Sequence, residues 1–127
     1  MRVIRQHIVG GPEVLHIEDV PPPVPAAGEV LVRTRAIGVN PVDVAVRSGA
    51  YPMLGEPPFV LGWDVAGVVQ SHGDLFDEGD EVLGLVGFPG AGATYAELLT
   101  AAESQLVRTE RHGTPWWVRH FWVPSYR

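Results

Sequence analysis

The sequence contains no cysteine, and its nine basic residues are all arginine. Without cysteine the chain has neither a disulfide framework nor a thiolate metal site, which agrees with a reducing compartment. We attribute the lack of lysine to a GC-rich genome. The first residues carry charges and lack the apolar stretch of a signal peptide, and no segment approaches the roughly 18 apolar residues of a membrane span. We therefore expect a cytoplasmic protein with no membrane partner.

The formal net charge is −6, and the charged residues are unevenly distributed along the chain. Residues 1–107 hold five arginines against fourteen acidic residues, whereas residues 108–127 hold four arginines against one acidic residue. Nucleic-acid binding requires a basic surface, so the acidic body argues against a nucleic-acid partner. The basic tail alone is weak support for any anionic partner.

A chain of 127 residues has room for one domain with its own core. Glycine and proline, at 15 and 12 residues, favour many turns and short strands over long helices. One short helix is predicted over residues 41–47, with Asn40 as its N-cap and Gly49 at its exit. The remaining pattern predicts a mainly β barrel or sandwich, with strands at residues 1–8, 15–20, 29–39, 65–70, 81–86 and 95–100.

A polar cluster follows the strand at residues 29–39. Asn40, Asp43 and Tyr51 lie on a glycine- and proline-rich segment, where a core does not need them, and we expect Asp43 and Tyr51 within reach of one another. Loops held by a rigid scaffold often carry binding groups, so the cluster is typical of a cleft lining. Each residue also has a structural alternative: a helix cap for Asn40, a first helical turn for Asp43, and packing for Tyr51.

Six sequence pieces occur in an order that resembles a known family. Together they resemble the N-terminal GroES-like catalytic domain of the medium-chain dehydrogenases/reductases, and most of all the zinc-independent NADPH:quinone oxidoreductases of the zeta-crystallin type. The resemblance covers residues 1–107 and implies a GroES-like, partly open β barrel with one or two short helices. The pieces are GGPEVL (10–15), GEVLVRTRAIGVNPVD (28–43), RSGAYP (47–52), GWDVAGVV (62–69), EGDEVLGL (78–85) and ATYAELL (93–99).

The residues at the metal positions of this superfamily argue against zinc. Zinc-dependent alcohol dehydrogenases have a cysteine where this chain has Asn40, and a His-Glu pair where it has Trp63 and Asp64. Catalytic zinc requires three nitrogen, sulfur or oxygen ligands, and neither an asparagine amide nor an indole is such a ligand. None of the five histidines has a second ligand at a helical or hairpin spacing. We expect no bound metal.

The resemblance also implies roles for the polar cluster. In the quinone reductases a hydride passes from NADPH to a quinone or enone, so the protein supplies orientation and polar contacts. Asn40 and Asp43 are expected to act in catalysis and to contact the cofactor, and Tyr51 to donate a hydrogen bond to a developing enolate or quinol oxygen. Trp63 is a candidate substrate contact, with burial in the core as its alternative. The loop at residues 87–92 is expected to be a turn rather than a phosphate cradle, since its spacing is not G-x-G-x-x-G.

The chain departs from the family after Val107. Relatives continue into a Rossmann domain that binds the cofactor, so NADPH is not expected to bind tightly to this chain alone. We expect residues 108–127, with three of the four tryptophans, to be an atypical tail that is frameshifted or disordered. The expected function is the substrate-side domain of a quinone or enone reductase, with little or no activity by itself. The alternatives are a noncatalytic module that forms homo-oligomers or binds a partner, and a fragment of an enoyl reductase.

Overall fold

The computed structural model describes residues 1–109, which form a mainly β fold of two antiparallel sheets and one α-helix. The smaller sheet has the order β2 (His16–Asp19), β1 (Arg2–Gln6), β4 (Phe59–Val60). In the larger sheet, β3 (Glu29–Ile37) lies between β7 (Leu98–Ala102) and β5 (Asp64–Val69), and β6 (Glu81–Leu85) and β8 (Val107–Arg108) follow β5. Both orders are open, so the barrel does not close within this part of the chain. The mainly β, partly open fold is confirmed.

The larger sheet carries the main hydrophobic core. Alternation along β3 buries Val30 and Val32 while Arg33 and Arg35 remain exposed, which is the two-residue period expected of a half-buried strand. Neighbouring strands and loops complete this cluster with Val65, Val69, Phe76, Val82, Val86, Leu99, Ala101 and Leu106.

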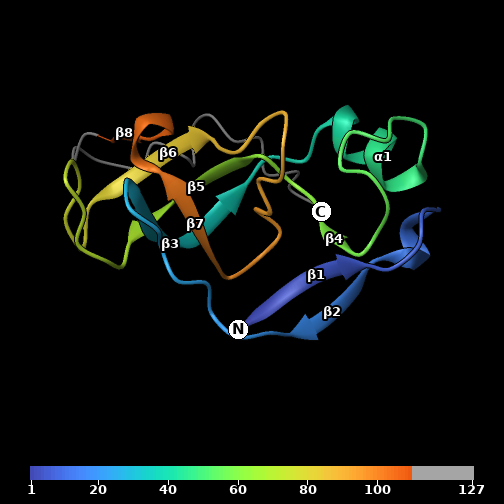
Figure 1. Cartoon of the computed structure of the whole chain (residues 1–127), viewed down its shortest axis with the longest axis horizontal. Coiled ribbons are helices and arrows are strands. Elements are labelled where there is room, and N and C mark those ends of the chain that lie inside the picture. Colours follow the sequence, from blue (N-terminus) through green and yellow to red (C-terminus); the bar gives the residue numbers. More distant parts are fainter. Residues whose placement is uncertain (110–127) are drawn as a thin grey trace, which may run out of the picture.

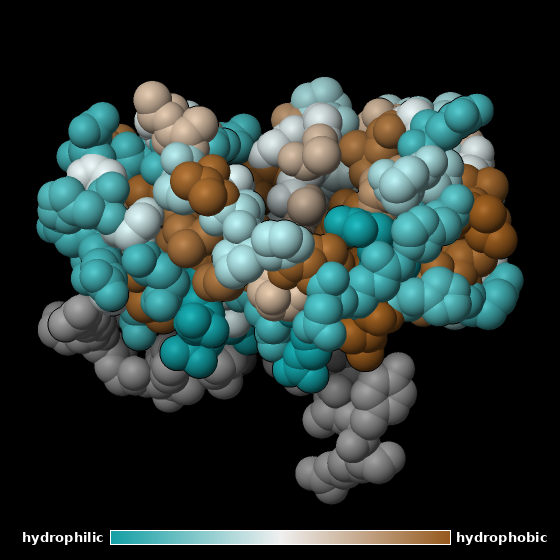
Figure 2. Space-filling view, turned by 60° about the horizontal axis from the view of Figure 1, so that its bottom comes forward, coloured by the Kyte–Doolittle hydropathy of each residue, from teal (hydrophilic) through white to brown (hydrophobic). Residues whose placement is uncertain are grey.

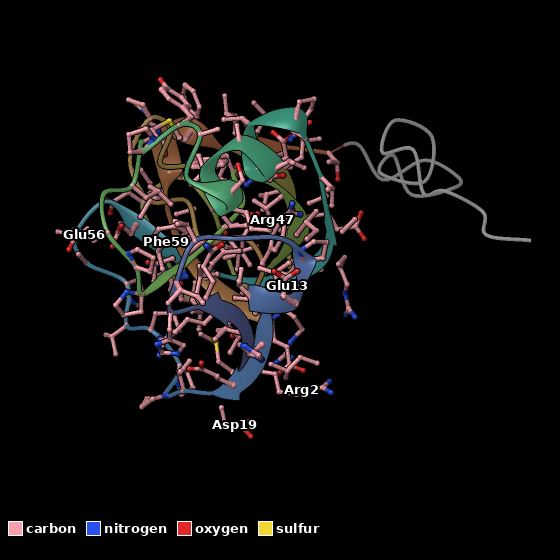
Figure 3. All side chains as sticks on the ribbon, turned by 90° about the vertical axis from the view of Figure 1, so that its right-hand side faces the viewer. Arg2, Glu13, Asp19, Arg47, Glu56 and Phe59 are labelled. Atoms are coloured by element: carbon pink, nitrogen blue, oxygen red, sulfur yellow. The ribbon has the colours of Figure 1, made fainter. Side chains whose placement is uncertain are left out.

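The α-helix α1 (Pro41–Ser48) closes one end of the molecule, beyond β4 and away from β8 (Figure 1). It begins as predicted after Asn40, with proline at its first position, and it ends at Gly49, whose φ of 85° a glycine adopts without strain. Its Val46 packs against Leu61, Trp63 and Tyr95 in a second core cluster between the helix and the smaller sheet. The carbonyl of Gly10 accepts a hydrogen bond from Nε of Arg47, which ties the last turn of α1 to the loop after β1 (Figure 3).

Four elements were not predicted. The strands β4 and β8 have only two residues each, and the 3-10 helices η1 (Pro12–Val14) and η2 (Glu103–Gln105) have three. The last predicted strand begins three residues late, at Leu98, because the chain around Tyr95 pairs with β1: Ile4 donates to the carbonyl of Tyr95 at 2.9 Å. No helix among residues 1–109 is long and apolar enough to span a membrane. The expectations for residues 110–127 lie outside the described part.

Candidate functional site

The candidate site is centred on Asn40, at the junction between β3 and α1. The Asn40 amide donates from Nδ2 to Oδ2 of Asp64, the first residue of β5, at 2.6 Å. Gly38 makes this contact sterically feasible, since a Cβ at that position would lie 2.4 Å from the Asp64 carboxylate. The Asn40 side chain is thereby fixed against the neighbouring strand.

Asp43 lies beneath Asn40 and is only 2% exposed. Its Oδ2 accepts the backbone N–H of Asn40 at 2.7 Å, which is the reciprocal bond of a capping box, and it accepts the hydroxyl of Tyr95 at 3.0 Å. Its Oδ1 is buried with no hydrogen-bond partner among the described residues. Burial raises the pKa of Asp43, helped by repulsion from Asp64, while the bonds from Asn40 and Tyr95 oppose the rise.

Tyr95 is a stable hydrogen-bond donor in this network. Burial, together with the adjacent Asp43 carboxylate, raises the pKa of its phenol well above the ordinary value. The hydroxyl therefore stays protonated at neutral pH and holds the start of α1 against the segment before β7. Asn40, Asp43, Asp64 and Tyr95 form a continuous chain of polar contacts that runs from the helix to β5, which we call the Asn40 network.

Tyr51 makes no hydrogen bond to this network. Its side chain is 51% exposed, and its hydroxyl makes no hydrogen bond within residues 1–109. Its backbone N–H donates to the carbonyl of Ala45, which fixes the turn that follows Gly49. The structure therefore joins Asn40 to Asp43 but provides no hydrogen bond from Tyr51 to either. A free, exposed phenol at this place is a donor available to a ligand.

Trp63 is 1% exposed, which matches the structural alternative for this residue. Its indole Nε1 donates to the carbonyl of Gly90 at 2.6 Å, and Phe88 packs edge-on at a ring-centroid distance of 5.9 Å. The loop at residues 87–92 therefore covers the indole. A substrate contact for Trp63 stays a prediction.

Two glycines of that loop serve close packing. A Cβ at Gly92 would lie 2.5 Å from the carbonyl oxygens of Gly62 and Val86, and one at Gly87 would lie 2.3 Å from the carbonyl oxygen of Ala91. These distances leave no room for side chains at the two positions, and the N–H of Gly87 donates to Oε1 of Gln105 at 3.0 Å. Among residues 1–109 no three histidine, aspartate or glutamate side chains gather in a group able to hold a metal ion.

Two members of the Asn40 network were not predicted as site residues. Asp64 follows Trp63 in the GWDVAGVV piece and received no role, and Tyr95 lies in the ATYAELL piece. A buried tyrosine hydroxyl needs a partner, so a tyrosine in an otherwise small and apolar segment was a usable signal. The sequence does not indicate which residue this partner is, because the pairing depends on the fold.

The comparisons with known proteins agree with the fold. The family model described as the alcohol dehydrogenase GroES-like domain matches residues 26–111. A quinone oxidoreductase from Mus musculus is 43% identical over 110 residues, covering 84% of this chain and 32% of the mouse protein. The resemblance predicted from the sequence is therefore confirmed.

Two solved structures are similar over most of the chain. The quinone oxidoreductase from Coxiella burnetii has a TM-score of 0.82 at 29% identity, covering 90% of this chain and 38% of that one. The Escherichia coli quinone oxidoreductase complexed with NADPH has a TM-score of 0.79 at 31% identity, covering 87% of this chain and 33% of that one. The chain spans about a third of the length of the curated relatives it matches. It belongs to the alcohol dehydrogenase GroES-like domain family.

Proposed function

We propose that this chain is the substrate-side domain of an NADPH-dependent, zinc-independent reductase of quinones or enones. The observation that carries the proposal is the hydrogen bond between Asn40 and Asp64. By resemblance, these positions hold a cysteine and a glutamate in the zinc enzymes. Here an amide nitrogen, which does not bind zinc, lies 2.6 Å from the carboxylate oxygen and leaves no space for an ion between them. The quinone oxidoreductases among the relatives support the substrate class.

We assign the proposed roles of the site residues according to how exposed their side chains are. Tyr51 offers its free hydroxyl to the substrate oxygen, and the Asn40 carboxamide, held by Asp64, orients the reacting groups. Asp43 is proposed to act through Asn40 and Tyr95, since its buried carboxylate bonds to both. Trp63 would support the substrate from beneath the loop at residues 87–92. The proposed partner is a small quinone or enone, and the proposed location is the cytoplasm.

The described residues do not fit the phosphates of NADPH. The start of α1, where helix dipoles favour an anion, already receives the Asp43 carboxylate on the Asn40 N–H. In the loop at residues 87–92, the N–H of Gly87 is likewise taken, because it donates to Oε1 of Gln105. The proposal therefore requires the cofactor's phosphates to be held outside residues 1–109, and this chain alone is proposed to bind NADPH weakly.

A chimera tests the proposed function. Residues 1–107 replace the matching segment of the Escherichia coli quinone oxidoreductase, and NADPH oxidation is followed with 1,4-benzoquinone and with an enoyl thioester as acceptors. We expect quinone-dependent turnover by the chimera and none by the 127-residue chain alone. A chimera that folds and binds NADPH but reduces neither acceptor rejects the proposal, and exclusive reduction of the thioester favours the enoyl reductase alternative.

A further inference from the structure

Phe88 is an exposed aromatic residue in a loop that is held on both sides. It is 45% exposed, and its ring meets the buried Trp63 edge-on, with a centroid distance of 5.9 Å and an angle of 80° between the ring planes. Before it, the N–H of Gly87 donates to Oε1 of Gln105 at 3.0 Å, and after it, the carbonyl of Gly90 accepts the indole N–H of Trp63 at 2.6 Å. A ligand that binds to this ring therefore loses little affinity to the ordering of the loop.

Exposure alone does not assign a function to Phe88. Figure 2 shows hydrophobic side chains exposed between hydrophilic ones over the side of the molecule that it brings forward, and Ile17 of β2 is 72% exposed. Single apolar side chains at the surface are normal in folded proteins. Phe88 differs from them in its position, which is next to the Asn40 network.

The fold places Phe88 and Asn40 at the same end of the larger sheet. β5 lies between β3 and β6 and runs antiparallel to both, so the ends of β3 and β6 flank its start (Figure 1). There the carbonyls of Trp63 and Asp64 accept the N–H groups of the residues just after β6 and β3, at 2.8 Å and 3.3 Å. Phe88 and Asn40 each lie two residues farther along the chain. Neighbouring strands are about 4.8 Å apart, so β3 and β6 end about 10 Å from one another.

This arrangement suits a flat ring that carries a carbonyl group. The Nδ2 amide group of Asn40 has two hydrogens, and the bond to Asp64 uses one of them, so the other is a donor for a substrate carbonyl. Phe88 offers an aromatic ring, and a planar conjugated ring that stacks on it gains more than the buried area alone provides. A quinone has both features in one molecule, whereas an open-chain enone has the carbonyl group without the ring.

We propose that Phe88 binds the ring of the substrate and thereby selects planar conjugated rings over open-chain enones. This role rests on the proposed function and names the side chain that recognises the quinone ring. Trp63 is then a positioning residue. It holds Phe88 and the loop at residues 87–92, but at 1% exposure it has too little free surface to bind a ring itself.

The chimera with the Escherichia coli quinone oxidoreductase tests this selection by steady-state kinetics. Phe88→Leu keeps an apolar cover over Trp63 but removes the aromatic ring. It should raise KM for 1,4-naphthoquinone about fivefold, the usual effect of one aromatic pair, and leave kcat unchanged, because the ring contacts substrate and transition state alike. KM for the open-chain enone 3-penten-2-one should not change. Phe88→Tyr keeps the ring and should match the wild type, as should the control Ile17→Ala at an exposed residue of β2.

NMR of the full 127-residue chain tests the contact without turnover. The chain contains no cysteine and no lysine, the side chains that quinones alkylate most readily, so 1,4-naphthoquinone can be titrated as a reversible ligand. We expect intermolecular nuclear Overhauser effects between the naphthoquinone protons and the ring protons of Phe88. This measurement uses the unaltered chain, so it decides the question even if Phe88→Leu does not fold.

The outcomes separate the role of Phe88 from the proposed function. A chimera that reduces quinones, but whose KM for 1,4-naphthoquinone is unchanged by Phe88→Leu, rejects the role of Phe88 and leaves the proposed function standing. An equal rise in KM for the quinone and the enone also rejects it, because the effect is then structural. If the chimera lacks turnover with every acceptor, the proposed function fails, and the Overhauser effects alone decide whether Phe88 binds a planar ring; their absence rejects it. Wherever the chimera turns over, the KM values decide.

Discussion

The hydroxyl of Tyr95 donates a hydrogen bond to Oδ2 of Asp43 at 3.0 Å, across 52 residues of sequence. The same oxygen receives the backbone N–H of Asn40, so one buried carboxylate joins the start of α1 to the segment before β7. The Asn40 side chain in turn bonds to Asp64 on β5. The position of Asn40 is therefore determined by three separate parts of the chain.

Replacement of Asp43 by asparagine is expected to stabilise the protein at neutral pH or leave it unchanged. The side-chain oxygen of the asparagine can accept both hydrogen bonds, and the substitution removes a buried charge. Folding raises the pKa of Asp43 above its value in the unfolded chain, which is about 3.9. The wild type therefore loses stability relative to Asp43→Asn as the pH rises from the unfolded pKa through the folded one. Urea unfolding at several pH values measures this difference.

The control for that series is Asp43→Ala. It leaves the Asn40 N–H and the Tyr95 hydroxyl without an acceptor and should cost about 2 kcal/mol or more. A wild type that is more stable than Asp43→Asn by the same amount at every pH would contradict the proposed cost of the buried charge.

Glu103 should have the opposite pH dependence. Its carboxylate accepts the N–H groups of Asp74, Leu75 and Phe76 at 2.9–3.2 Å, and these bonds lower its pKa. The stability that it contributes is complete above the ordinary glutamate pKa and is lost as pH falls through the lowered value. Glu103→Gln should therefore lower the urea midpoint at pH 7 and make the loss of stability with falling pH less steep. Glu56→Gln, at an exposed carboxylate with no hydrogen bond in the described part, should do neither.

Gly67 is expected to tolerate no side chain. It lies in β5 opposite Thr34, and a Cβ at this position would lie 2.2 Å from the carbonyl oxygen of Arg33. Backbone in the middle of a sheet moves little, so Gly67→Ala should cost about 3 kcal/mol or more, or prevent folding. Gly90→Ala is the matched control, since its nearest neighbour would be 3.2 Å away; equal denaturation midpoints for the two variants would contradict this view.

Local signals explain what the sequence predicted well. Asn40 and the following proline mark the start of α1, and Gly49 marks its end. The predicted helix is one residue shorter than the observed one. The alternation over residues 29–39 likewise identified β3. In contrast, β4 and β8 are two-residue strands that exist only because β1 and β6 lie beside them, and no local pattern contains that information.

The candidate site shows the same limit. Asn40 and Asp43 are three residues apart at a helix start, so their contact follows from capping geometry. Asp64 and Tyr95 join them only through the packing of β5 and of the segment before β7, which sequence spacing does not contain. The expected proximity of Tyr51 to Asp43 stays a prediction: the turn at Gly49 and the bond to Ala45 fix the Tyr51 backbone, and its half-exposed side chain makes no hydrogen bond to Asp43.

Tyr51→Phe tests the proposed substrate contact in the chimera with the Escherichia coli protein. Its hydroxyl has no hydrogen bond in the described part of the chain, so its removal should leave the thermal midpoint unchanged. If it donates to the oxygen that gains charge during reduction, kcat with 1,4-benzoquinone should fall about tenfold, the effect of one hydrogen bond formed in the transition state. The control Leu75→Ala removes another exposed side chain, one that lies on the turn held by Glu103, and should not change kcat. An unchanged kcat in Tyr51→Phe would assign Tyr51 to packing and leave the half-buried Asn40 as the remaining candidate for the polar contact.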